Sequence, residues 1–146
     1  MRDQLVGLQD LFPTCCALAG RPAPDGIDGS SLLPFLADGA LRGRDFIVAT
    51  CRCKNTCCAR DFKYIHTQAG GREELYDLRR PEPEAVNLAA NPAYISVRRE
   101  LRAQLARWCR DNGDAAALDG DDLARSPLEA APPARFDATR LGWRPY

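Results

Sequence analysis

The sequence predicts an α+β fold in which a small antiparallel sheet of about four strands is covered by one amphipathic helix. Two features of the sequence carry this prediction. Short runs rich in β-branched and aromatic residues follow one another between residues 46 and 78, with tight turns between them, as in an antiparallel sheet. After them, residues 91–113 repeat apolar side chains at helical spacing. Shorter helical segments are expected before the sheet.

The first expected element is a short helix over residues 10–19. Asp10 is placed to cap its amino end, and Gly20 is a natural stop because glycine adopts the left-handed conformation that ends many helices. A second short helical segment is predicted over residues 32–36, with Ser30 or Ser31 as its cap.

The strands of the predicted sheet are short and lie close together in the sequence. They are expected over residues 46–51, 57–60, 62–67 and 74–78. Asn55 is the turn candidate after the first strand, and Gln-Ala-Gly-Gly at residues 68–71 is a good hairpin connection between the last two.

A longer helix follows the sheet. Asn91 followed by Pro92 is a strong helix start, and Gly113 is placed to end the helix in a Schellman motif. One apolar stripe consists of Tyr94, Val97, Leu101, Leu105 and Trp108. We expect this stripe to cover the sheet face that carries Phe46, Val48, Tyr64 and Tyr76, or their alternating neighbours. The arginine-rich remainder of the helix is expected to face water.

The chain is predicted to have three parts. Residues 1–40 hold the short helices, residues 41–113 hold the sheet and its covering helix, and residues 114–146 are expected to form an irregular tail. The tail prediction rests on four prolines and the lack of any sustained periodicity.

Composition excludes several classes of protein. The 146 residues carry 20 basic and 20 acidic side chains, so the formal net charge is zero and a nucleic-acid partner is not expected. No apolar run approaches the roughly 18 residues that a membrane-spanning helix needs. The amino end lacks a hydrophobic signal core, so a chain expressed as written is expected in the cytoplasm.

A cluster of four cysteines is the first candidate for a metal-binding site. Cys51, Cys53, Cys57 and Cys58 offer soft ligands for zinc, but neither of the usual paired spacings of zinc knuckles occurs here. The favoured interpretation is that these thiols act as small apolar side chains, so no metal site is assigned. The single histidine, His66, is interpreted as a surface residue of a strand. The acidic pairs at residues 73–74 and 121–122 are interpreted as solvated.

Several segments resemble the C-terminal part of the sulfatase family. The matching segments are Asp-Leu-Phe-Pro-Thr at 10–14, Leu-Ala-Gly at 18–20, Asp-Gly-Ser-Ser-Leu-Leu-Pro at 28–34, Phe-Lys-Tyr-Ile at 62–65, Glu-Leu-Tyr-Asp-Leu at 74–78 and Glu-x-x-Asn-Leu-Ala at 84–89. Each segment is weak alone, but their order and spacing make the resemblance specific. It covers about residues 5–110 and leaves the tail unaccounted for.

The resemblance implies the last helices of a sulfatase main α/β domain, followed by its small antiparallel domain. Sulfatases hydrolyse sulfate esters with a formylglycine made within a Cys/Ser-x-Pro-x-Arg motif, and they bind calcium. That motif does not occur in this sequence. The resemblance therefore implies that calcium and formylglycine belong to the full-length family enzyme and that no cofactor is held by this chain. The expected partner is an N-terminal catalytic domain, either in cis or as a split chain, and this chain is expected to be inactive alone.

Two alternatives stay open. The chain could be a non-catalytic α+β interaction module derived from a sulfatase, or a small protein that binds metal through its cysteine cluster. If the sulfatase resemblance holds, Arg60, Lys63 and His66 are candidates for the edge of the substrate site, because they are polar and close together beside the sheet.

Overall fold

A computed structural model describes residues 4–38, 44–51 and 53–127. Its elements in chain order are the 3₁₀ helix η1 (Leu8–Asp10), α1 (Leu11–Leu18), α2 (Leu33–Asp38), β1 (Phe46–Cys51), β2 (Lys54–Ala59), β3 (Phe62–Thr67), β4 (Arg72–Asp77), η2 (Pro92–Tyr94), α3 (Ile95–Asp111), η3 (Ala115–Ala117), β5 (Leu118–Asp119) and β6 (Asp122–Leu123).

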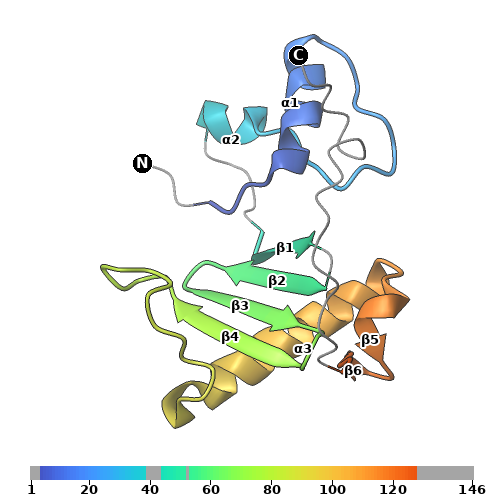
Figure 1. Cartoon of the computed structure of the whole chain (residues 1–146). Helices are drawn as coiled ribbons and strands as arrows, with labels where there is room; N and C mark the ends of the chain where they lie inside the picture. The colour runs from blue at the N-terminus through green and yellow to red at the C-terminus, as the bar shows by residue number, and fades with distance from the viewer. Residues whose placement is uncertain (1–3, 39–43, 52, 128–146) are drawn as a thin grey trace, which may run out of the picture.

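The four main strands form one antiparallel sheet in the order β1-β2-β3-β4, and α3 runs across one face of it (Figure 1). The short helices α1 and α2 lie together beyond the β1 edge of the sheet. The predicted α+β fold, with four strands and a covering helix, is confirmed.

The core lies between α3 and the sheet. Val48, Cys57, Tyr64 and Leu75 are register partners across the four strands, so their side chains point to the same face. The predicted helix stripe meets this face: Leu101 and Leu105 are buried in the core, and Tyr94, Val97 and Trp108 pack against it. Tyr76 is the exception to the prediction, because its neighbour Leu75 occupies the helix-facing position.

The carboxyl end of the long helix is as predicted, whereas at the amino end Asn91 caps the 3₁₀ turn η2 and α3 itself begins at Ile95. The Asn91 side chain accepts a hydrogen bond from the backbone N–H of Ala93 at 3.0 Å. At the other end, Gly113 has a φ of 73°, and the backbone N–H of Asp114 donates to the carbonyl of Cys109 at 2.8 Å. This is the Schellman geometry, which any residue with a Cβ would adopt less readily than Gly113.

The amino-terminal helix differs from the prediction in one respect. It consists of η1 followed by α1, and the side chain of Asp10 makes no cap to α1. It is used instead to hold a distant segment, as described below. The second helix begins at Leu33, whose backbone N–H donates to the Ser31 hydroxyl at 3.3 Å.

Two further predictions are wrong. Asn55 is not a turn residue but a buried member of β2, opposite His66. Residues 114–127 are not irregular, because η3 and the β5–β6 hairpin fold back onto α3 and bury Ala117 and Leu123. The apolar signal of this hairpin is too short to show as periodicity. The remainder of the predicted tail, residues 128–146, and the predicted boundary at residue 41 lie outside the described residues.

Within the described segments, no helix is both long enough and apolar enough to cross a bilayer.

Candidate functional site

The three predicted substrate-edge residues do not share one surface. Arg60 is exposed between β2 and β3. Lys63 lies on the sheet face away from α3, and its Nζ donates to the Glu84 carboxylate at 2.7 Å. His66 lies on the face that α3 covers, since it alternates with Lys63 and Ile65 along β3. Their role at a substrate edge stays a prediction.

His66 is buried rather than at the surface, so that part of the interpretation is wrong. Its side chain is 0% exposed because the segment after β6 covers the end of β3. His66 Nε2 lies 2.8 Å from the carbonyl oxygen of Ala124, and because a carbonyl can only accept, Nε2 is the nitrogen that donates. Its Nδ1 has no hydrogen-bond partner among the described residues. Burial lowers the pKa of His66, and the nearby Arg102 guanidinium also lowers it.

The cysteine cluster is dispersed over both faces of the sheet. Cys57 points into the core, where burial raises its pKa to about 12, whereas Cys58 points to the opposite face. Cys51 and Cys53 are exposed near the β1–β2 connection, and all seven thiols are free. In the part of the chain that the structure describes, no group of three or more His, Cys, Asp or Glu side chains is placed to hold a metal ion.

A buried ion pair joins the amino-terminal segment to the start of the sheet. The Asp10 carboxylate is 0% exposed and accepts hydrogen bonds from Arg44 Nη1 and Nη2 at 2.5 and 2.7 Å. It also accepts from the backbone N–H groups of Gly7 and Ser30 at 2.9 Å each. These interactions, with Arg44 the largest contributor, lower the pKa of Asp10 to about 2. Asp10 therefore fixes η1, the loop before α2 and the entry to β1 relative to one another.

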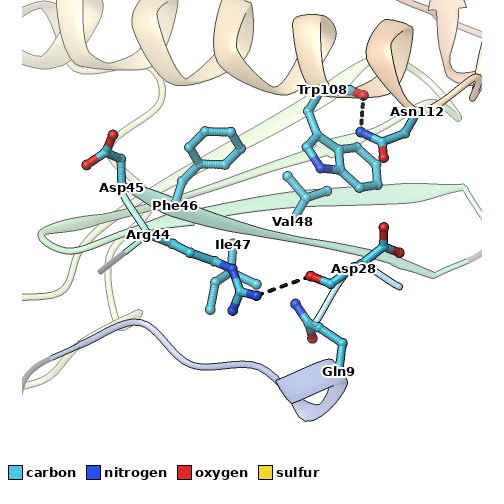
Figure 2. Close-up of a pocket in the computed structure, with 9 residues that line it drawn as sticks. All are labelled: Gln9, Asp28, Arg44, Asp45, Phe46, Ile47, Val48, Trp108 and Asn112. Atoms are coloured by element: carbon cyan, nitrogen blue, oxygen red, sulfur yellow. Dashed lines mark hydrogen bonds between the residues drawn. The ribbon is translucent and has the colours of Figure 1, made fainter. Parts of the chain in front are cut away.

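A hollow of about 580 Å³ opens beside this ion pair, between η1, the edge strand β1 and the carboxyl end of α3 (Figure 2). Its lining residues are Gln9, Asp28, Arg44, Asp45, Phe46, Ile47, Val48, Trp108 and Asn112. Phe46 and Trp108 lie on the side toward α3, and Asp28 and Gln9 lie across from them. Neither the hollow nor the ion pair was predicted from the sequence, because each joins segments that are far apart in the chain.

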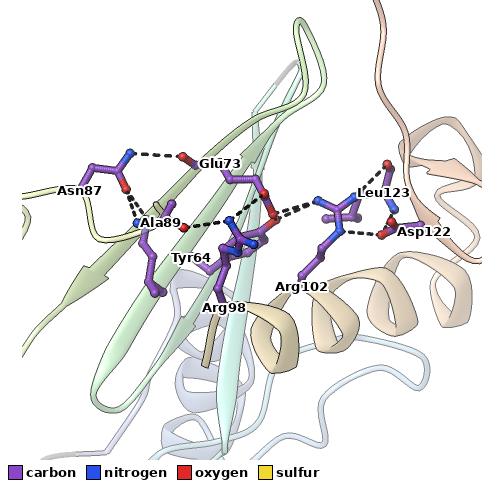
Figure 3. A network of polar contacts seen from close by, with 9 residues as sticks. Tyr64, Glu73, Asn87, Ala89, Arg98, Arg102, Asp122 and Leu123 are labelled. Atoms are coloured by element: carbon purple, nitrogen blue, oxygen red, sulfur yellow. Dashed lines mark hydrogen bonds and ion pairs between the residues drawn. The ribbon is translucent and has the colours of Figure 1, made fainter. Parts of the chain in front are cut away.

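A second polar network links α3 to β3, β4 and the β5–β6 hairpin (Figure 3). Arg102 Nη1 donates to the Glu73 carboxylate at 3.0 Å, and Arg102 Nε donates to Asp122 at 2.7 Å. The Tyr64 hydroxyl donates to the same Glu73 oxygen at 2.7 Å, and Arg98 lies 3.6 Å from the other oxygen. Burial alone would raise the pKa of Glu73, but the hydrogen bonds from Tyr64 and Arg102 outweigh it and lower the pKa.

Because of this network, the sequence-based interpretations of the acidic pair at residues 73–74 and of the arginine-rich side of α3 are wrong in part. Glu73 and its neighbour Glu74 are not solvated, since Glu74 is buried and bonded to Arg72 and Tyr76. The arginine-rich side of α3 is only partly solvated, because the side chain of Arg102 is 14% exposed. Sequence spacing alone could not show which arginine meets a carboxylate on a neighbouring strand.

Replacing Arg102 with leucine should lower the free energy of unfolding by about 2 kcal/mol, because Glu73 keeps its burial and loses its closest cation. Urea denaturation followed by circular dichroism measures this change. Arg99→Leu is the matched control, because Arg99 is exposed on the same helix and should change stability by less than about 0.5 kcal/mol. Equal effects of the two substitutions would contradict a structural role for the network.

No family model matches the chain. Over 135 residues, covering 84% of this chain, it is 29% identical to a Δ4,5-hexuronate-2-O-sulfatase of Bacteroides thetaiotaomicron. Over 77% of the chain it is 25% identical to an ulvan-active sulfatase of Formosa agariphila. The chain spans only 28% and 30% of the lengths of these two curated relatives.

The chain is also similar to solved structures of sulfatases. A protein assigned as a sulfatase from Bacteroides thetaiotaomicron superposes with a TM-score of 0.66 and 28% identity, over 84% of this chain and 28% of its own. A 2-O GAG sulfatase gives a TM-score of 0.66 and 28% identity, over 80% of this chain and 27% of its own. The region matched in such structures is their C-terminal region.

Proposed function

Because this chain corresponds to the C-terminal portion of a sulfatase, we propose that it is the structural subdomain of a sulfuric ester hydrolase that acts on sulfated carbohydrate. In this proposal the chain supplies the sheet and covering helix that complete the enzyme, while the bond-breaking groups come from an N-terminal catalytic portion. That portion is joined in cis or binds as a separate chain. The observation that supports the proposal is the joint match of sequence motifs and fold to about 28% of each sulfatase.

The described residues do not fit the calcium site or the nucleophile of such an enzyme. Asp10 is bonded to Arg44 before the sheet, whereas Glu74 and Asp77 point to opposite faces of β4 and are bonded to Arg72 and Arg79, so the three buried carboxylates do not converge on one point. The sequence contains no Cys/Ser-x-Pro-x-Arg motif from which formylglycine could be made. We therefore assign no step of sulfate-ester hydrolysis to a residue of this chain.

The carbohydrate class of the substrate is inferred from the relatives. One acts on a hexuronate 2-O-sulfate and another on ulvan, as their names state. We propose a sulfated sugar unit of a polysaccharide as the substrate of the complete enzyme. Arg60 and Lys63, whose side chains are not covered by α3, are proposed to lie toward that substrate, with His66 acting only through the packing of β3.

A chimera tests the proposal. In it, this chain replaces the matching C-terminal portion of the hexuronate-2-O-sulfatase, and the comparison proteins are that enzyme intact and that enzyme with the portion deleted. We expect the chimera to turn over the parent substrate, the deletion to lose turnover, and this chain alone to show none with or without calcium. Sulfate release measured by ion chromatography reports the activity.

Two results would overturn the proposal. One is a chimera that unfolds cooperatively yet releases no sulfate. The other is sulfate release by this chain alone that scales with protein and survives repurification.

A further inference from the structure

The hollow between η1, β1 and α3 has the composition of a site for an uncharged sugar. It combines the flat rings of Trp108 and Phe46 with carboxylate and amide side chains across from them (Figure 2). Sugars present both an apolar face of C–H groups and a rim of hydroxyls, so they suit a pocket with one aromatic wall and one polar wall. Its volume of about 580 Å³ is enough for one or two sugar rings.

Three side chains that line the hollow have oxygen atoms that can accept hydrogen bonds from hydroxyl groups. The carboxylates of Asp28 and Asp45 are exposed, and neither has an ion-pair partner among the described residues. Asn112 donates its Nδ2 to the carbonyl of Trp108 at 2.9 Å, and its Oδ1 receives no hydrogen bond from a described residue. Carboxylate and amide oxygens are strong acceptors for hydroxyl groups.

The walls of the hollow are held in place before any ligand arrives. Arg44, at its centre, is fixed by Asp10 and also donates to the backbone carbonyl of Asp28 at 3.2 Å. A Cβ on Gly29 would lie 1.9 Å from the carbonyl oxygen of Gln9, so only glycine lets the loop carrying Asp28 approach η1 this closely. A preformed site loses less entropy on binding.

Charge selects the kind of ligand. The positive charge of Arg44 is balanced by Asp10, so among the described residues that line the hollow the unbalanced charges are the two carboxylates, Asp28 and Asp45. A sulfated sugar would be repelled there, and a basic group would lie close to the Arg44 guanidinium. We propose that this hollow binds a neutral hexose or pentose unit of a glycan, at a site separate from the one that holds the sulfate ester. This inference does not rest on the proposed function, because it concerns binding by this chain alone.

Titration of the full ¹⁵N-labelled chain with three neutral tetrasaccharides tests the proposal: cellotetraose, mannotetraose and xylotetraose. We expect saturable shifts of the Trp108 indole and Asn112 side-chain signals by at least one of them, with a Kd of about 1 mM. Asp28→Ala removes the carboxylate, and Asn112→Ala removes the amide oxygen together with its Nδ2 bond to the Trp108 carbonyl. Both residues are exposed, and each substitution should raise that Kd roughly five- to tenfold. Asp25→Ala, in the same loop but outside the hollow, should leave it unchanged.

Other results would overturn the proposal. They are the absence of saturation by all three sugars up to about 20 mM, an unchanged Kd in both hollow variants, or tighter binding of the 6-O-sulfated form of the bound sugar. Shifts at Trp108 produced by L-arginine methyl ester but by none of the sugars would assign the hollow to a basic side chain instead. A failure here leaves the chimera experiment unaffected, since that experiment measures sulfate release.

Discussion

Replacing Leu105 with alanine should lower the free energy of unfolding by about 4 kcal/mol, which is the largest effect we expect from a single substitution. The side chain is 0% exposed and lies in the core between α3 and the sheet, so its removal leaves a cavity that rigid strands cannot fill. Guanidinium denaturation followed by circular dichroism gives the change directly.

The matched control for this prediction is Leu8→Ala. Leu8 is 85% exposed, so the same chemical change should alter stability by less than about 0.5 kcal/mol. A loss at Leu105 no greater than the loss at Leu8 would show that α3 does not cover the sheet in solution.

Replacing Asp10 with alanine should cost about 3 kcal/mol, because it leaves the Arg44 guanidinium without its carboxylate and two backbone N–H groups without an acceptor. The cost falls at the lower end of the range for buried pairs, since the Arg44 side chain is 28% exposed and can still reach water. Asp25→Ala is the control, because Asp25 is exposed and outside the ion pair.

The same ion pair makes stability depend on pH with a definite sign. The pKa of Asp10 is about 2 in the folded chain, against an ordinary value of 3.8, so the unfolded chain binds the proton first as the pH falls. The stabilisation is complete above about pH 5 and is lost as the pH falls toward 2. Asp10→Asn should therefore lose less stability than the natural chain between pH 5 and pH 2. Asp77, whose pKa is also lowered, titrates in both proteins and cancels in this comparison.

The fold could be predicted from the sequence because its signals are local. The strands are predicted by runs of β-branched and aromatic residues, and the long helix by apolar residues at helical spacing, each within about 20 residues. Asn91 and Gly113 mark helix ends by their own conformational preferences. The β5–β6 hairpin cannot be predicted in this way, because its strands are two residues each, below the length at which alternation can be recognised.

The candidate sites could not be predicted in the same way. Asp10 and Arg44 are 34 residues apart in the sequence. An aspartate that caps a helix cannot be distinguished in a sequence from one that forms a buried ion pair. The sequence predicts His66 at the surface, because nothing near it in the chain indicates that the segment around Ala124 covers it. Burial of a polar side chain is decided by distant elements, and a single sequence does not show which elements meet.

The order of the strands has a consequence for how the chain assembles during its synthesis. Each strand of the sheet pairs only with its neighbours in the sequence, so β1 to β4 can pair one after another as they leave the ribosome, with short loops to close. The apolar face of that sheet is covered only when α3 is complete. The last residue of α3, Asp111, is synthesised 34 residues after Asp77, the end of β4. At ordinary rates of synthesis this interval lasts about 2–7 s. During this interval Tyr64 and Leu75 lie on a sheet face that α3 does not yet cover, so a chaperone can bind the nascent sheet there.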